Sequence, residues 1–554
     1  MGVLSSRWGR GRRARSSLVR GARRASRRGG GGRAPAPGRL CANGPFRDPR
    51  EHAIHARTAS GLLVLALALT SCTSSAAGEG DDAGAGQRSA ASATTSSGAV
   101  LARPAGRSAL LAAASGPEAA VALSAHLLET SPSVVVAADE PAALERGAAV
   151  AAGLGVPLLL PGAATAGEVR RLGAEEVLTV GGVAATWAEQ ALTERGDPDV
   201  QEAGAPRPAT SQGGTGTVVL LTGAAWEAAA AATARAVGAQ VLTVPSGDPR
   251  ADGAVVEALH AAAPQHVVGL GPAFAAQDVF AARVETAVTG VQVPGGGQLP
   301  LAGRRLIALY GHPGAPSLGL LGEQPLQATL ERARELAGRY DGLDERPAVP
   351  TLEIITTVAS GSPGPDGDYS NEVDPAELEE WVDAAGAAGV AVVLDLQPGR
   401  TDFLTQAKRY ESLLLRPHVG LALDPEWRLA PGQVHLRQIG SVGADEVNAV
   451  GDWLAQLVRE NALPRKVFLL HQFRTSMVRD RESVDTGRDE LVTVVHADGH
   501  GTPGMKEATY GVLTSQGPPG LVWGWKNFLD EDDPTFTPAE TVAVEPSPVF
   551  VSYQ

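Results

Sequence analysis

Cysteine is almost absent from this chain: among 554 residues only Cys41 and Cys72 occur, and none follows position 72. A disulfide framework and a cysteine-ligated metal site are therefore excluded for everything beyond Cys72. Aromatic residues are scarce as well, at 4% of the chain, and most of them lie in its second half. Ala, Gly and Arg are abundant while Lys is rare, which is typical of a high-GC organism such as an actinobacterium.

Long apolar runs are missing too. The run Gly61–Leu69 is too short to span a bilayer as a helix. It follows a basic segment and ends at Leu69-Thr70-Ser71-Cys72, which resembles a bacterial lipoprotein signal. That resemblance implies cleavage before Cys72, lipidation of its thiol, and an anchor outside the cytoplasmic membrane. The alternative is an ordinary signal peptide with an incidental cysteine. Residues 1–71 are predicted as the signal segment and 72–105 as a flexible tether.

The net charge is −14, and removal of the basic segment 1–57 would make the remainder more acidic still. This argues against nucleic acid and anionic lipid as partners. Gly181-Gly182 follows an apolar run, but no Lys, Ser or Thr stands at P-loop spacing after it. Nucleotide binding is therefore not expected, and no cofactor is predicted.

Residues 106–300 alternate short β-branched runs with Ala-rich stretches, the pattern of a parallel βαβ sheet. The pattern repeats. Strand, helix, strand, helix, strand begins at SVVVAAD (133–139) and again at TVVLLTG (217–223), an offset of about 84 residues. The sequence thus predicts a duplicated βαβ module.

Two segments of the first unit, GLGVPLLLPG (153–162) and RRLGAEEVLTVGG (170–182), resemble cell wall-binding repeat type 2 domains. They correspond to the family's two apolar strands with a Gly-Gly turn. The family's Phe-Pro-Asp before its helix is missing, and the second unit matches only in pattern. The resemblance implies attachment to an anionic cell-wall polymer. The alternative is a plain α/β sandwich that uses Gly181-Gly182 for a tight turn.

Residues 303–554 contain eight near-continuous apolar runs with helical stretches between several of them. The runs are 305–314, 351–360, 389–399, 418–427, 466–473, 491–499, 521–528 and 549–554. The stretch after Asp374 carries an N-cap, a proline at the first helical position and Glu377 three residues on. These features predict a (β/α)₈ TIM-like barrel, so the fold class is α/β: a duplicated parallel-sheet module followed by a barrel.

The active site of such a barrel lies at the C-terminal ends of its strands. Polar and aromatic residues end almost every predicted strand, which is more than helix capping requires. They are Tyr310, His312, Asp395, Gln397, Asp424, Glu426, Trp427, His471, Gln472, His496, Asp498, Trp523, Trp525, Lys526, Tyr553 and Gln554. Carboxylates, imidazoles and indoles together favour a carbohydrate site, with Trp427, Trp523 and Trp525 available to stack on sugar faces.

The Asp-x-Glu of LDPEW (423–427) resembles the strand-four motif of chitinase-like and lysozyme-like barrel glycosidases. The resemblance implies Glu426 as general acid and Asp424 as the group that tunes it. The proline between them and the lack of a longer Asp-rich motif depart from the family. We expect Asp395 as a second carboxylate. The remaining predicted substrate-binding residues are Tyr310, His312, Gln397, Trp427, His471, Gln472, His496, Asp498, Trp525 and Lys526.

Two alternatives stay open. One is a non-catalytic lipoprotein that binds carbohydrate or wall polymer. The other is a metal-dependent hydrolase with His471, His496 and Asp498 as ligands, although no H-x-H or HExxH pair occurs. Serine-based hydrolysis is disfavoured, since no G-x-S-x-G occurs.

Overall fold

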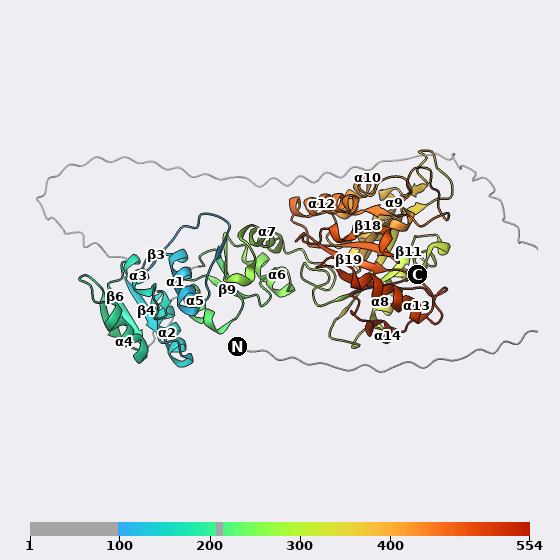
Figure 1. Ribbon diagram of the computed structural model, residues 1–554. Helices are drawn as coiled ribbons and strands as arrows, with labels where there is room; N and C mark the ends of the chain where they lie inside the picture. Colours follow the sequence, from blue (N-terminus) through green and yellow to red (C-terminus); the bar gives the residue numbers. More distant parts are fainter. Residues whose placement is uncertain (1–97, 206–213) are drawn as a thin grey trace, which may run out of the picture. The chain divides into compact units, whose positions relative to one another are not determined.

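The computed structural model of the chain describes residues 98–205 and 214–554 (Figure 1). The predicted signal segment, Cys72 and residues 72–97 of the predicted tether lie outside the described residues. Within the described ranges, no helix is both long enough and apolar enough to cross a membrane.

Residues 108–288 form two four-stranded parallel sheets. The first has the order β5 (Leu158–Leu159), β4 (Ser133–Ala137), β6 (Glu176–Val180), β7 (Asp199–Glu202). The second has the order β2 (Ser108–Leu111), β10 (His266–Leu270), β8 (Thr217–Leu221), β9 (Gln240–Thr243). In each sheet the strand that comes first in its predicted unit, β4 or β8, lies between the two that follow it. A further pair, β1 (Val100–Leu101) with β3 (Leu128–Thr130), is antiparallel and includes two residues of the predicted tether.

The described helices of this part are α1 (Gly116–Leu127), α2 (Pro141–Leu154), α3 (Thr165–Arg171), α4 (Gly182–Ala191), α5 (Ala228–Ala236) and α6 (Gly253–Ala262) before and between the strands, and α7 (Gln277–Val288) after β10. Helix α5 contacts both α1 and α2. Its alanines are almost all buried, so the small side chains permit this close packing. Because helices cover the sheets, the central strand β4 is apolar from Val134 to Ala137 and fully buried.

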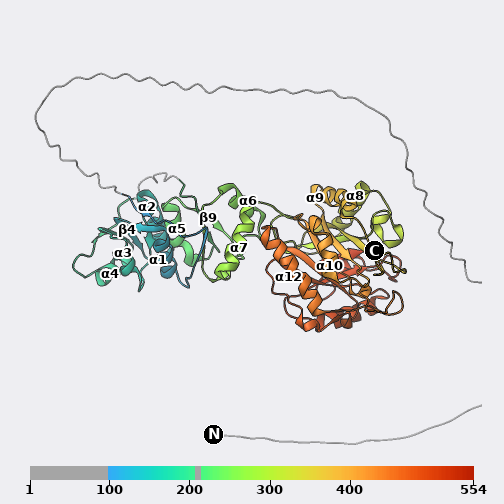
Figure 2. The ribbon, with the colours of Figure 1, turned by 90° about the horizontal axis from the view of Figure 1, so that it is seen from above.

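Residues 305–553 form a closed barrel of eight parallel strands, which confirms the predicted barrel (Figures 1 and 2). In chain order the strands are β11 (Arg305–Gly311), β12 (Ala348–Ala359), β14 (Ala391–Leu396), β15 (Val419–Leu423), β17 (Lys466–Gln472), β19 (Leu491–Ala497), β20 (Val522–Asn527) and β21 (Phe550–Tyr553). The short β13 (Ser370–Glu372) pairs antiparallel with the end of β12. Two loop strands, β16 (Val442–Gly443) and β18 (Val478–Arg479), pair with each other.

The helices between barrel strands are α8 (Leu326–Gly338), α9 (Pro375–Ala387), α10 (Phe403–Arg409), α11 (Glu411–Leu414), α12 (Ala444–Glu460), α13 (Pro503–Ser515) and α14 (Pro538–Val542). Helix α9 begins as predicted, with the Asp374 carboxylate accepting from the Ala376 N–H. Helix α12 buries Val447, Val450 and Leu454, the stripe that its helical spacing predicts.

Side chains alternate between the two faces of each barrel strand, so the barrel has two apolar cores. One fills the lumen towards the N-terminal ends of the strands and includes Leu306, Ala308, Val393, Leu469 and Phe550. The other lies between strands and helices and is much larger. The half of the lumen near the N-terminal ends of the strands, its lower half, is apolar. The half near their C-terminal ends, its upper half, is polar.

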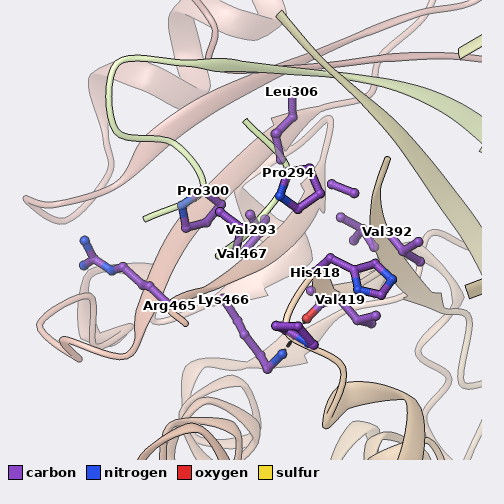
Figure 3. A pocket seen from close by; sticks show the side chains of 14 residues that line it. Val293, Pro294, Pro300, Leu306, Val392, His418, Val419, Arg465, Lys466 and Val467 are labelled. Atoms are coloured by element: carbon purple, nitrogen blue, oxygen red, sulfur yellow. Dashed lines mark hydrogen bonds between the residues drawn. The ribbon is translucent and has the colours of Figure 1, made fainter. Parts of the chain in front are cut away.

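The segment 293–303 packs under the N-terminal ends of the strands (Figure 3). Gln298 is fully buried there, and its carbonyl accepts from the Arg465 N–H at 3.0 Å. A pocket of about 20 Å³ remains beside Lys466, which is room for about one water molecule. Burial lowers the pKa of Lys466 to about 7, and its Nζ donates to the Arg416 and Val419 carbonyls. This amine is thus occupied in closing the base of the barrel.

Candidate active site

The upper half of the lumen is built by residues at or near the C-terminal ends of the strands. Tyr310, Glu353, Asp395, His471 and His496 all point inward and are fully or almost fully buried. Such a polar cluster costs desolvation energy unless its members pair with one another. Burying this polar cluster therefore costs the barrel desolvation energy that an apolar core would not cost.

His471 is the centre of this cluster. Its Nε2 donates to Glu353 Oε1 at 2.9 Å, and its Nδ1 donates to Asp498 Oδ2 at 3.1 Å. Asp395 Oδ1 lies 3.7 Å from the same Nε2. Burial alone would lower the pKa of His471, but the carboxylates of Glu353 and Asp395 outweigh it and hold the pKa well above its ordinary value. The ring is therefore an imidazolium with both N–H groups engaged.

Tyr310 and Asp395 form a second buried pair. The Tyr310 hydroxyl donates to Asp395 Oδ2 at 2.8 Å and accepts from Gln397 Nε2 at 3.3 Å. Lys526 Nζ lies 3.5 Å from the centroid of the Tyr310 ring. Burial raises the pKa of Asp395 to about 6, although the His471 cation opposes the rise. Three predicted site residues, Tyr310, Asp395 and Gln397, are thus joined by hydrogen bonds.

His496 differs from His471 because no carboxylate of the described residues pairs with it. Its Nε2 lies 3.2 Å from Ser552 Oγ, and burial, together with the neighbouring His471 cation, lowers its pKa well below the ordinary value. It is therefore a neutral imidazole at physiological pH.

Above the cluster lies a cavity of about 700 Å³, within the usual size range of small-ligand sites. Its wall includes the predicted residues Tyr310, Gln397, Asp424, Glu426, Trp427, Asp498 and Lys526. It also includes residues that sequence reasoning missed, among them Phe473, Arg474, His500, Met505 and Phe528. Met505 lies in the first turn of α13 and the others follow strands β17, β19 and β20, where no pattern in a single sequence predicts convergence.

Glu426 and Asp424 meet at the cavity wall. Strand β15 ends at Leu423, Asp424 caps a single 3₁₀ turn, η5 (Pro425–Trp427), and Glu426 lies within that turn. Burial raises the pKa of Glu426 to about 7, and repulsion from Asp498 adds to the effect. Burial and the neighbouring Glu426 also raise the pKa of Asp424 well above its ordinary value.

Asp498 behaves in the opposite way. Burial alone would raise its pKa, but the hydrogen bond and positive charge of His471 lower it. The wall of the cavity therefore carries both a carboxylic acid, Glu426, and an ionised carboxylate, Asp498. Two carboxyls whose pKa values are driven apart are the arrangement that general acid–base chemistry needs.

Unpartnered buried atoms also gather at this site. Within the described part of the chain they include Glu353 Oε2, Asp395 Oδ1, Asp424 Oδ1, His496 Nδ1 and Asp498 Oδ1. An unpaired buried polar atom costs about 1–3 kcal/mol, so five in one lumen indicate groups that wait for a polar ligand or for water.

Two predicted site residues point away from the lumen. Trp525 is buried in the outer core between strand and helices, where its Nε1 donates to Asn527. Gln472 also points outward and accepts from Arg481 Nε at 3.0 Å. Each stands next to an inward residue, Lys526 or His471, and adjacent strand residues face opposite sides.

Trp523 likewise packs against the outer core, so neither Trp523 nor Trp525 is placed to stack on a sugar in the cavity. His312 is half-buried beside the barrel mouth, and its Nδ1 donates to the Ile355 carbonyl at 2.9 Å. Trp427 is the predicted tryptophan that lines the cavity.

Glu353 was missed by sequence reasoning although it is a central partner of His471. Strand β12 runs for 12 residues, so Glu353 lies in its middle and not at its end. A lone glutamate within the run TLEIITTVA was the available signal, because a charge inside a buried strand must have a partner.

The same cluster contains a set of potential metal ligands. Glu353, His471 and His496 each offer one ligand atom, and these atoms lie within 4.8 Å of one another. However, both ring nitrogens of His471 already donate to carboxylates. A metal ligand needs a ring nitrogen without a proton. The hydrogen bonds therefore account for this cluster better as a buried ion network.

Comparison with known proteins adds little. No protein family matches the chain, and no curated protein is similar to it in sequence. A weak structural neighbour is Cwp6 from Clostridium difficile, 11% identical, with a TM-score of 0.12. The match covers 79% of this chain and 48% of Cwp6, so the chain spans about half the length of that protein. A TM-score this low carries no argument about the fold, and the function has to follow from the site.

Proposed function

We propose that the barrel hydrolyses glycosidic bonds of a polysaccharide, with Glu426 as the general acid. The observation that carries this proposal is a carboxyl on the wall of a cavity of about 700 Å³ whose pKa is raised to about 7. A carboxyl with that pKa keeps its proton near neutral pH and can give it to the leaving oxygen.

Asp498 is the proposed base or nucleophile. It lines the same cavity, its Oδ1 has no partner, and His471 keeps it ionised. This replaces the expected role of Asp395, which lies below the cavity wall and is bound by Tyr310. Asp395 and Glu353 are instead proposed as positioning residues, because they hold the imidazolium that orients Asp498.

Trp427 is the proposed sugar platform. It lies next to Glu426 on the cavity wall, and its ring packs on His435 with centroids 5.3 Å apart. A buttressed indole beside the acid can stack on the apolar face of a sugar ring and fix its position.

The test is Glu426→Gln in the full chain. Release of reducing ends from a panel of cell-wall and other polysaccharides should fall by about 10²-fold or more, while binding to the same polysaccharide is retained. The control is Glu482→Gln, an exposed carboxyl of the same barrel, which should not change the rate. If the wild-type protein releases no reducing ends but binds a glycan, the non-catalytic binding protein is the correct interpretation.

The remaining part of the proposal concerns location. The strand order shared by the two N-terminal sheets supports a duplicated module, and its resemblance to wall-binding repeats suggests a wall polymer as its ligand. Lipidation of Cys72 would anchor the protein outside the cytoplasmic membrane. Globomycin should then leave a larger precursor, and Cys72→Ser should abolish membrane partitioning; unchanged partitioning would contradict the anchor.

A further inference from the structure

A second cavity, of about 480 Å³, lies at the same end of the barrel. We call it the arginine cavity. Three arginines from three consecutive connections between barrel strands line it: Arg400 after β14, Arg428 after β15, and Arg479 in β18 after β17. In a chain with a net charge of −14, three guanidinium groups around one hollow need an explanation.

Among the residues that the structure describes, Arg428 is the one of the three arginines that has a carboxylate partner. Arg428 forms a two-pronged ion pair with Glu446, at 2.9 and 3.3 Å. Glu446 is fully engaged, because its Oε1 also accepts from the Phe403 N–H. Among the described residues, Arg400 and Arg479 have no carboxylate within 4.0 Å, so the cavity carries an excess of two positive charges.

Arg400 is held in place with a donor to spare. Its Nη2 donates to the Gln433 carbonyl at 2.8 Å, and its guanidinium carbon lies 4.4 Å from the centroid of the Tyr369 ring. Its Nε is buried and has no partner. Tyr369 has a backbone φ of +67°, a left-handed conformation that is costly for a residue with a side chain. The strained backbone of Tyr369 thus supports the guanidinium of Arg400, whose Nε–H is available for a further hydrogen bond.

The arginine cavity and the catalytic cavity share one wall, the loop 424–443. Glu426, Trp427 and Ile439 line the catalytic cavity, whereas Arg428 and Ser441 line the arginine cavity. The Gly440 N–H donates to the Glu426 carbonyl at 2.7 Å, which ties the two arms of the loop together. Arg428 is two residues from the proposed acid, so at most about 7 Å of backbone separates the two residues.

We propose that the arginine cavity binds an anionic group, a carboxylate or a phosphodiester, on a unit near the bond that is cleaved. The substrate is then an acidic polysaccharide and not a neutral one. Guanidinium forks bind both kinds of oxyanion through paired N–H···O bonds, which explains why arginine occupies all three positions. This inference rests on the proposed function, because the hydrolase proposal places the scissile bond beside Glu426. The anion site itself is defined by the three arginines.

The test measures binding of the full chain to three defined probes: an oligogalacturonate, its fully methyl-esterified neutral form of equal length, and poly(glycerol phosphate). Calorimetry in about 50 mM salt limits the screening of surface charges. The wild-type protein should bind at least one anionic probe about tenfold or more tightly than the neutral oligomer. The probe that binds identifies the carboxylate or the phosphodiester as the natural group.

The main variant carries both Arg400→Gln and Arg479→Gln. Arg479→Gln alone is a second variant: it changes only an exposed side chain, so its effect on binding cannot be ascribed to misfolding. Arg437→Gln is the matched control, because Arg437 is an exposed arginine of the same loop that lines neither cavity. The double variant should lose about tenfold or more of the anion affinity, the single variant part of it, and the control none. Equal affinity for the neutral and anionic probes, or an equal loss in the control, overturns the inference.

Failure of the two proposals can be told apart. If the anion preference depends on Arg400 and Arg479 but no polysaccharide is cleaved, the anion site stands and the hydrolase is wrong. If Glu426-dependent cleavage occurs and neutral substrates are cleaved as well as acidic ones, the hydrolase stands and the anion site is wrong.

Discussion

Glu426→Gln should remove activity and, at alkaline pH, make the protein more stable. The pKa of Glu426 is raised from 4.5 to about 7, mainly by burial. A carboxyl with a raised pKa contributes its full stability when protonated, below pH 4.5, and loses it as the pH rises through about 7. At 1.36 kcal/mol for each pH unit between the two values, ionised Glu426 costs the folded wild type up to about 3 kcal/mol.

Glutamine has nearly the same shape and cannot ionise. We therefore expect equal melting temperatures for the two proteins near pH 4.5 and a higher one for the variant at pH 8.5. For a domain of this size the difference should be roughly 5–10 °C. Scanning calorimetry or circular dichroism measures it, and Glu482→Gln should show no pH-dependent difference. A variant that melts lower than the wild type at both pH values would contradict the burial argument.

The same proton should govern the rate. Wild-type activity should decline above about pH 7, as Glu426 loses the proton that it donates. It should also decline in acid, once Asp498 becomes protonated. A rate that keeps rising up to pH 9 would exclude Glu426 as the general acid.

Three further outcomes are expected. Trp525→Ala should destabilise the barrel by about 3–5 kcal/mol, since Trp525 fills the outer core. Trp427→Ala should leave the stability nearly unchanged and weaken glycan binding about tenfold. Calorimetry of unfolding measures the first effect, and calorimetry of binding measures the second. Gly440→Ala should reduce activity by about tenfold or more in a reducing-end assay, because its Cβ would lie 2.4 Å from the Glu426 carbonyl and displace the loop that carries the acid. Chelation with EDTA should leave activity intact, since both ring nitrogens of His471 are occupied; loss of activity restored by zinc would favour the metal-dependent hydrolase.

The sequence was sufficient to predict the barrel because a barrel of this type leaves a repeated pattern of apolar runs in the sequence. Eight buried strands must be continuous apolar runs when helices cover them, and the N-cap at Asp374 and the stripe of α12 mark their helices independently. The packing of the segment 293–303 was not predictable for a related reason: Gly and Pro mark irregular backbone, but they do not show whether that backbone packs against something.

The site was less predictable because it depends on strand parity. Lys526 and Trp525 both end an apolar run, yet only one of two neighbours can face the lumen, and the register that decides between them is set by closure of the barrel. The same rule separates His471 from Gln472. Glu353 was not predicted as a site residue because β12 continues past the level at which the lumen becomes polar, so Glu353 does not stand at the end of its strand. The convergence of Arg400, Arg428 and Arg479 depends on loops that no periodic pattern describes.

The most direct test of the hydrolase proposal is to digest an acidic cell-wall polysaccharide with the full chain in ¹⁸O-labelled water and to analyse the products by mass spectrometry. We expect new reducing ends that carry one ¹⁸O atom with the wild-type protein and none with Glu426→Gln. The absence of labelled reducing ends with the wild type, or equal labelling with both proteins, would contradict it.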